Sequence, residues 1–113
     1  MAVDKSLISG STAMLILRLL EEKDMYGYEM IEKLRSKSNN VFELKAGTLY
    51  PLLHSMVEKD WLTAYEQEAG GKLRKYYQLT REGKRQLTRK REEWKEYSEA
   101  VVQVLGGVCY DPV

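Results

Sequence analysis

The stretch AGTLYPLLHSM, residues 46–56, combines the apolar spacing of a helix with a proline. Its large apolar side chains recur as on one face of a helix: Leu49, Leu52, Leu53 and Met56. Pro51 lacks a backbone N–H and costs least in the first turn, where the N–H groups have no partner within the helix. We therefore predict a helix over about residues 46–60, N-capped by Thr48 with Pro51 in its first turn. The N-terminus of such a helix presents backbone N–H groups to an anion such as phosphate.

Composition limits the class of protein. The 113 residues are 43% hydrophobic and 31% charged, as in a single soluble globular domain with a modest core. No apolar run approaches the ~20 residues that span a bilayer, and the N-terminus lacks the order of a signal peptide. One cysteine, Cys109, and one histidine, His54, argue against a disulfide and a zinc site. We expect a cytoplasmic protein without cofactor or metal, and no enzyme, because no cluster of catalytic groups is present.

The net charge of +1 conceals an asymmetry. Residues 72–91 carry nine basic side chains against the single acidic Glu82, a local charge of +8, so the other 93 residues sum to −7. One interpretation is a solvated face without a partner. A polyanionic partner is favoured because the basic block follows a turn and a strand and is not confined to one helix.

The rest of the chain divides into helices and one hairpin. Helices are predicted over residues 8–23 and 26–37, the second capped by Asp24. Their apolar stripes are Leu15, Ile16, Leu19 and Leu20 in the first, and Tyr28, Ile31 and Leu34 in the second. Residues 61–67 and 73–80 are β-prone runs around a glycine turn. Thr80 is expected to cap a last helix to about Leu105, which Gly106–Gly107 end.

This order of elements predicts a mainly α fold with a small β-hairpin (α+β). The fold expected is a winged helix-turn-helix over residues 1–80, a long C-terminal helix over residues 81–105 and a short tail over residues 106–113.

Three stretches resemble the signatures of the PadR family of transcriptional regulators: YGYEMIEKL (26–34), GTLYPLLHSMVEKDWL (47–62) and GGKLRKYYQLTREGKRQL (70–87). The resemblance runs in order from about residue 8 to residue 105 and is to the short subfamily, which has a single C-terminal helix. It implies a homodimeric repressor that binds double-stranded DNA at an inverted-repeat operator. It also implies that a small molecule or cellular signal changes the affinity for that operator.

Two alternatives to this function are open. A winged-helix protein-interaction module without DNA binding would not need basic residues concentrated at the wing. A MarR-like or ArsR-like regulator is the nearer competitor, but the GTLYP helix favours PadR, and the missing Cys/His sets disfavour a metal sensor.

The candidate DNA-binding residues lie on the recognition helix, the helix before it and the wing. A recognition helix meets the major groove by its N-terminal residues, and basic wing residues suit the minor groove or its phosphates. We assign phosphate contacts to Tyr28, Lys45 and Thr48, base or sugar contacts to Tyr50 and His54, and wing contacts to Lys72, Arg74 and Lys75. Core packing is the alternative for Tyr28 and Tyr50, and an inert surface position for His54. Tyr76 and Tyr77 are interpreted as strand packing and not as base-stacking platforms.

The last helix carries an apolar seam that needs a covering surface: Leu87, Trp94, Tyr97, Val101 and Val104. The expected cover is a partner subunit, including its first helix, which makes the seam a dimer interface. The alternative is that the first helix of the same chain covers it.

Trp94 matches a position at which some drug-responsive PadR-like regulators have a tryptophan. In those relatives the tryptophan and its symmetry mate sandwich a planar ligand, which implies a multidrug-type effector site here. The resemblance extends this site to Ser11, Met14, Ser98 and Val101 as lining, with ordinary interface packing as the alternative. Acidic residues on this half of the helix favour a cation over a phenolic anion: Glu92, Glu93, Glu96 and Glu99. Cys109 is interpreted as inert and not as a redox switch.

Overall fold

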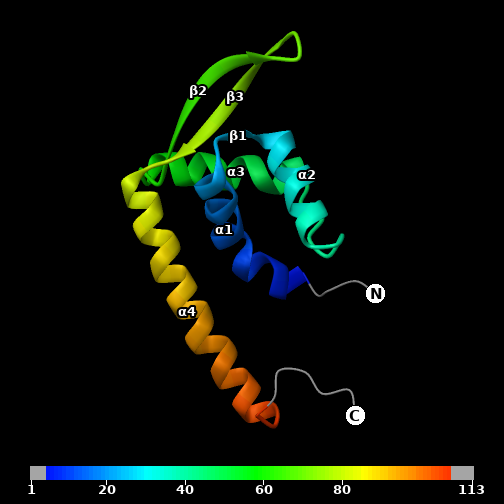
Figure 1. The fold of residues 1–113 in the computed structure, drawn as a ribbon, viewed down its shortest axis with the longest axis vertical. Coiled ribbons are helices and arrows are strands. Elements are labelled where there is room, and N and C mark those ends of the chain that lie inside the picture. Colours follow the sequence, from blue (N-terminus) through cyan, green and yellow to red (C-terminus); the bar gives the residue numbers. More distant parts are fainter. Residues whose placement is uncertain (1–4, 108–113) are drawn as a thin grey trace.

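The computed structural model describes residues 5–107, with side chains from Gly10 onward. The elements are α1 (Lys5–Glu22), β1 (Met25–Tyr26), α2 (Gly27–Lys37), α3 (Ala46–Glu58), β2 (Leu62–Ala69), β3 (Lys72–Leu79) and α4 (Arg81–Leu105). Figure 1 shows the hairpin projecting from one end of the three-helix core while α4 extends from it in the opposite direction. The predicted fold class, a winged helix-turn-helix followed by a long helix, is confirmed. The interpretation of Cys109 falls outside the described residues.

The sheet has three strands and not only the two of the predicted hairpin. Its order is β1-β3-β2, all antiparallel, with Met25 opposite Tyr77 and Tyr65 opposite Tyr76. Gly70 and Gly71 form the whole turn between β2 and β3, with φ of 61° and 80°. Two successive positive φ values favour glycine and match the twist of the two strands. The predicted glycine turn is therefore confirmed.

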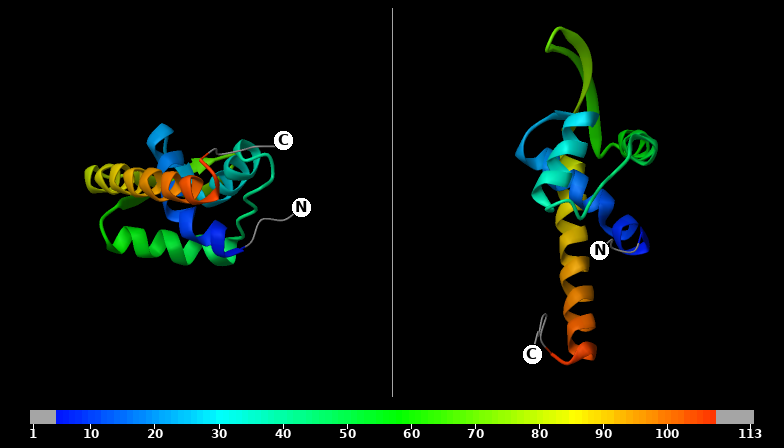
Figure 2. Two further views of the ribbon diagram at one scale, coloured as in Figure 1. Left: turned by 90° about the horizontal axis from the view of Figure 1, so that it is seen from below. Right: turned by 90° about the vertical axis from the view of Figure 1, so that its right-hand side faces the viewer.

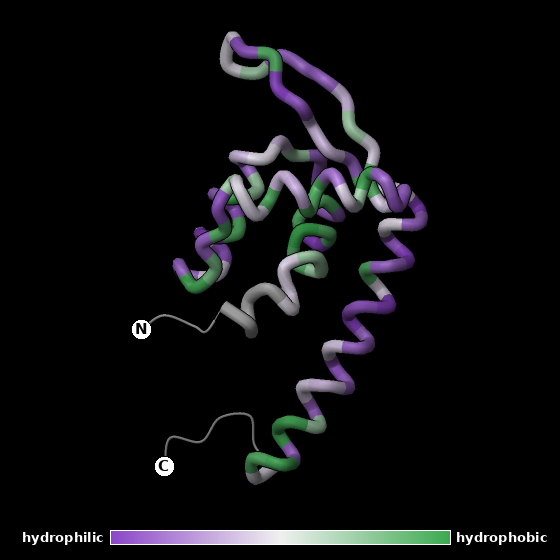
Figure 3. The backbone as a smooth tube through the Cα atoms, turned by 180° about the vertical axis from the view of Figure 1, so that it is seen from behind, coloured by the Kyte–Doolittle hydropathy of each residue, from purple (hydrophilic) through white to green (hydrophobic). Residues whose placement is uncertain are grey.

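The core lies where α1, α2 and α3 meet the inner face of the sheet and the start of α4. The nine large side chains that are essentially inaccessible come from almost every element: Ile16, Leu17, Met25, Met30, Leu49, Leu53, Met56, Leu62 and Leu87. In Figure 2, α3 projects to one side of the molecule and is seen end-on in the right-hand view. Figure 3 shows a hydrophobic stretch at the C-terminal end of α4, away from this core.

Two details of α3 differ from the prediction. The helix begins at Ala46 as expected, but its N-cap is Lys45, whose carbonyl oxygen accepts the N–H groups of Thr48 and Leu49 at 2.9 Å each. Pro51 therefore lies in the second turn, where it removes the hydrogen bond that the Gly47 carbonyl would accept. Both residues are exposed, so water can solvate that carbonyl.

Two expectations for α2 were also wrong. The N-cap is Tyr26, and the Asp24 carboxylate accepts a hydrogen bond from the Tyr65 hydroxyl at 2.6 Å. Tyr28 does not belong to the apolar stripe, because it is exposed while Met30 and Leu34 are buried. A partner 41 positions away in the chain, not a local backbone N–H, satisfies the Asp24 side chain.

The start of α4 is fixed as predicted. The Thr80 hydroxyl oxygen accepts the Gly83 N–H at 2.9 Å, and the hydroxyl donates to the backbone carbonyls of Asp60 and Trp61 in the connection after α3. The helix ends at Gly106, which has a φ of 128°.

Candidate DNA interface and the adjoining groove

The outward face of α3 is polar and accessible. Leu49, Leu53 and Met56 are buried, whereas Thr48, Tyr50 and His54 are exposed. His54 lies 3.5 Å from the Glu58 carboxylate, both side chains being largely in solvent. The helix therefore leaves its three predicted candidate residues accessible from outside, although Tyr50 also packs on the rest of the protein.

Tyr50 is held in place although 45% of it is exposed. Its phenol packs against Gly27 at the start of α2, and a Cβ atom at Gly27 would collide with the Tyr50 hydroxyl and ring. Burial raises the pKa of the neighbouring Tyr77, and the Tyr50 hydroxyl adds to that rise. Tyr50 is thus both a packing residue and a surface residue. Gly27 was missed by the sequence reasoning, although a glycine between two tyrosines at a helix start is the available signal.

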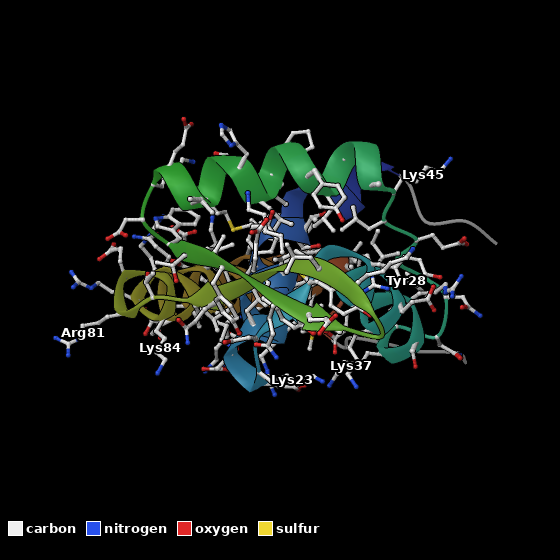
Figure 4. The ribbon with its side chains drawn as sticks, turned by 90° about the horizontal axis from the view of Figure 1, so that it is seen from above. Lys23, Tyr28, Lys37, Lys45, Arg81 and Lys84 are labelled. Atoms are coloured by element: carbon white, nitrogen blue, oxygen red, sulfur yellow. The ribbon has the colours of Figure 1, made fainter. Side chains whose placement is uncertain are left out.

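Exposed cations lie at the N-terminal end of α3 and at the start of α4. Seen from the wing in Figure 4, Lys45 and Tyr28 lie toward the N-terminal end of α3, while Arg81 and Lys84 point outward from the start of α4, across the view from α3. All four side chains are exposed. Arg81 and Lys84 belong to the basic block of residues 72–91, but no DNA contact was predicted for them from the sequence.

The three basic residues of the wing are not equivalent. Lys72 and Lys75 are exposed, whereas Arg74 is half-buried. The Arg74 guanidinium lies 4.4 Å from the centroid of the Tyr26 ring, and its Nε donates to the Ala69 carbonyl at 3.4 Å. Arg74 therefore also fastens the wing to β1, because it stacks on a residue of that strand.

A row of aromatic rings continues from this contact along the outer face of the sheet. Tyr26 meets Tyr76 edge-on at 5.4 Å, and Tyr76 stacks on Tyr65 at 5.6 Å. The hydrogen bond that the Tyr65 hydroxyl donates to Asp24 raises the pKa of Tyr65 to about 12. Tyr77 is buried on the opposite face. The prediction of strand packing is therefore confirmed for Tyr77, whereas for the partly exposed Tyr76 it stays a prediction.

A groove of about 300 Å³ runs between α1 and α4. It is lined by Gly10, Ala13, Met14, Lys90, Glu93, Trp94 and Tyr97. The rings of Trp94 and Tyr97 lie 5.9 Å apart. Of the five predicted effector residues, Met14 and Trp94 lie together in this groove, while Ser11, Ser98 and Val101 are outside its lining.

The seam of α4 is covered by its own chain only at its start. Leu87 is buried in the core, but Trp94 is 50%, Tyr97 59% and Val104 87% exposed. Burial within the chain therefore accounts for one of the five seam residues, Leu87.

Within residues 5–107 the structure contains neither a metal-binding cluster nor a membrane-spanning helix. No group of three or more His, Cys, Asp or Glu side chains in this part of the chain is arranged to hold a metal ion. None of the helices in this range is both long and apolar enough to cross a membrane.

The three-helix core, the three-stranded antiparallel sheet and the glycine-turned hairpin define a winged helix-turn-helix protein. The model of the family described as "Transcriptional regulator PadR-like family" matches residues 16–89. The chain therefore belongs to the PadR-like family of transcriptional regulators, a family of regulators and not of enzymes. This membership decides against the MarR-like alternative.

Individual relatives agree with this membership. The chain is 37% identical over 108 residues to the Uncharacterized protein X of Lysinibacillus sphaericus, a match that spans 94% of this chain and 98% of that protein. A transcriptional regulator from Clostridium thermocellum is 32% identical, with a TM-score of 0.81 over 87% of this chain and 96% of that one. A PadR family regulator from Clostridium difficile is 38% identical, with a TM-score of 0.73 over 85% and 99%.

Proposed function

We propose that the protein is a ligand-responsive repressor that binds an inverted-repeat operator as a homodimer in the cytoplasm. The observation that carries the DNA-binding part is the outward face of α3. Thr48, His54 and the exposed part of Tyr50 can meet base edges or the sugar–phosphate backbone, and Lys45 lies at the N-terminal end of the helix. Together with the basic wing, this is the arrangement by which a winged helix-turn-helix grips the major groove and the adjoining phosphates.

The exposed seam of α4 supports the homodimer. Trp94, Tyr97, Val101 and Val104 form an apolar strip on a helix whose own core is already complete. Such a strip on a folded domain marks a surface that another protein covers. A second copy of the chain is the occupant we propose, because two-fold symmetry also supplies two recognition helices for an inverted repeat.

The groove beside the seam supports an effector of a defined chemistry. Trp94 and Tyr97 offer aromatic faces and Met14 offers an adaptable apolar wall, while the Glu93 carboxylate, paired with Arg89, and the Lys90 side chain complete the lining. Aromatic faces attract a planar ring, and more strongly a cationic one. We therefore propose a planar aromatic cation, held where the two copies of Trp94 approach each other across the dimer axis.

Selection from a pool of random duplexes tests DNA binding and identifies the operator in the same experiment. The expected product is an inverted repeat with half-sites one helical turn apart, about 34 Å. Placed over a promoter, the selected sequence should lower reporter expression when the protein is present. Binding without an enriched motif would contradict sequence-specific recognition, and no binding at all would favour the protein-interaction module.

Equilibrium dialysis with rhodamine 123, a planar cationic dye, tests the effector site. Trp94→Ala should lose most of the binding while remaining a dimer by light scattering. Trp61→Phe, which replaces the other tryptophan, serves as the matched control and should retain it. Equal binding by Trp94→Ala and the parent would show that Trp94 is ordinary interface packing.

A further inference from the structure

Lys90 lines the groove and also contacts the indole of Trp61. Its side chain lines the groove between α1 and α4, and its ammonium lies 5.5 Å from the ring centroid of Trp61, within cation–π range. Trp61 is outside the lining of the groove, and only Lys59 and Asp60 separate it from Glu58, the last residue of the recognition helix α3. Lys90 is therefore a physical link between the groove and that end of α3.

Hydrogen bonds hold the backbone of Trp61 between the recognition helix and the start of α4. Its backbone N–H donates to the Met56 carbonyl at 2.9 Å, which closes the end of α3. Its own carbonyl accepts the Thr80 N–H at 3.1 Å and the Thr80 hydroxyl at 3.0 Å. Gly83 sits so close to this carbonyl that a Cβ atom there would collide with it. A shift of Trp61 relative to α4 must therefore also move the end of α3 and the base of the wing.

The charges around Lys90 leave its ammonium available to the indole. Glu93, which shares the groove, is paired with Arg89 at 2.8 Å. Over residues 10–107, no carboxylate forms an ion pair with Lys90. The other cation on the same indole, Lys59, lies 5.0 Å from the ring centroid and does not line the groove.

We propose that Lys90 is a positioning residue that couples occupancy of the groove to the placement of Trp61, and through Trp61 to operator affinity. The proposal rests on the proposed operator binding. The experiment with a groove ligand also rests on the proposed effector site. An occupant of the groove contacts the stem of Lys90, and a cationic occupant also repels its ammonium. Either effect changes how Lys90 sits on the indole. A cation–π contact of this kind corresponds to a change of about two- to fivefold in affinity.

Filling the groove by mutation tests the coupling without any ligand. In the Trp94→Phe protein, Trp61 is the single tryptophan, so its emission reports its surroundings. Ala13→Leu adds bulk to the groove lining, and the same change is made with and without Lys90→Met. With Lys90 present, filling should shift the Trp61 emission and change the Kd for the selected operator about two- to fivefold. With Lys90→Met, both responses should largely vanish. The same response in both backgrounds would overturn the proposal.

Lys59→Met is the matched control. It removes the other cation from the same indole but from outside the groove, so the response to filling should persist. Met14→Phe is a second groove-filling variant in case Ala13→Leu does not fold. Light scattering on every variant separates an effect on Trp61 from a loss of the dimer.

A second experiment uses rhodamine 123. It distinguishes a groove that does not bind the dye from a groove that binds the dye without changing operator affinity through Lys90. If the dye binds the parent and changes operator affinity, the operator must change dye affinity by the same factor. In Lys90→Met, the dye should change operator affinity little, and the operator should change dye affinity little. If the dye does not bind, the effector chemistry is refuted while the groove-filling arm still decides the role of Lys90. If no operator is selected, the DNA-binding function fails, and unchanged Trp61 emission on filling would overturn the coupling as well.

Discussion

The phenol of Tyr50 occupies the space that a side chain at Gly27 would need. This contact joins the outward face of the recognition helix to the start of α2. It therefore explains why a glycine fits inside YGY opposite the tyrosine of GTLYP, although the two stretches lie far apart in the chain.

Gly27→Ala should displace the Tyr50 ring. Overpacking of this kind costs about 1–3 kcal/mol of unfolding free energy, and the cost should fall at the lower end because a half-exposed ring can swing outward. Operator preference should change as well, since Tyr50 lies on the face that we propose to meet DNA. Urea denaturation and a second duplex selection measure the two effects. Gly47→Ala is the control: apart from its chain neighbours and the nearby backbone of α3, nothing lies within 4 Å of its added Cβ, so it should stabilise α3 by about 0.5–1 kcal/mol.

Gly83→Ala should be more damaging than Gly27→Ala. The atom that its Cβ would meet first is the backbone carbonyl oxygen of Trp61, which cannot rotate away. The start of α4 would have to shift and weaken the Thr80 hydrogen bonds, at a cost of about 3 kcal/mol or more. Denaturation midpoints measure the loss. Arg91→Ala, at an exposed position of the same helix, should stay within about 0.5 kcal/mol of the parent. A Gly83→Ala protein as stable as the parent would contradict the rigid junction.

Light scattering at micromolar concentration should give twice the chain mass of 13.1 kDa. The double variant Val101→Asp/Val104→Asp should give a monomer, because two carboxylates would be buried without partners in the dimer. Val41→Asp alters an exposed valine in the α2–α3 connection and should leave the dimer intact. A monomeric parent would exclude both the dimer and the symmetric operator.

Lys72→Ala/Lys75→Ala should weaken binding to all DNA sequences alike. Each lost phosphate contact flattens the dependence of log K on log salt by about 0.9, so four contacts in a dimer flatten it by about 3–4. Titrations at several salt concentrations measure this slope. Arg74→Gln should differ, because it also loses the contact with Tyr26 and with it about 0.5–1 kcal/mol of stability in the absence of DNA. An unchanged slope in the double variant would refute the wing assignment.

The Tyr65–Asp24 hydrogen bond predicts a stability change at high pH. The pKa of Tyr65 is raised from 10.0 in the unfolded chain to about 12 in the folded one. The stabilisation is therefore complete below pH 10 and is lost as the pH rises toward 12. Burial raises the pKa of Tyr77 in the same direction, so Tyr65→Phe should remove only part of the effect. Phenolate absorbance in a titration of the parent and the variant identifies the tyrosine that ionises near pH 12. A phenolate absorbance change near pH 12 as large in Tyr65→Phe as in the parent would contradict the assignment.

The elements that were predictable from the sequence are those with local signals. The apolar spacing of α3, the Gly70–Gly71 turn and the Thr80 cap each depend on residues within a few positions of one another. Strand β1 was not predictable, because so short a strand carries no periodicity and its pairing partner is distant in the chain. Asp24 has the local context of a helix cap, yet a distant hydroxyl competes successfully for its carboxylate.

In the candidate sites too, residues with a local sequence signal could be predicted, whereas those that depend on contacts between distant parts of the chain could not. The outward residues of α3 and the basic wing residues could be named from spacing and charge. The difference between Arg74 and its two neighbours depends on Tyr26, which only the folded sheet brings near. Met14 and Trp94 lie on the first and last helices and were paired by resemblance, whereas Lys90 and Tyr97 needed the packing of α1 on α4 to be recognised as part of the same groove.

The shortness of β1 has a consequence for motion at the wing. Because β1 pairs only with Tyr76 and Tyr77, the part of the hairpin from Glu66 to Lys75 is a two-stranded ribbon with both edges open to solvent. A ribbon of this size is marginally stable alone in water. Its backbone amides should therefore exchange with solvent through local opening, long before the helical core unfolds. The tip beyond Arg74 can then bend to follow the width of a groove, while the Arg74–Tyr26 contact holds the ribbon to β1 at that position.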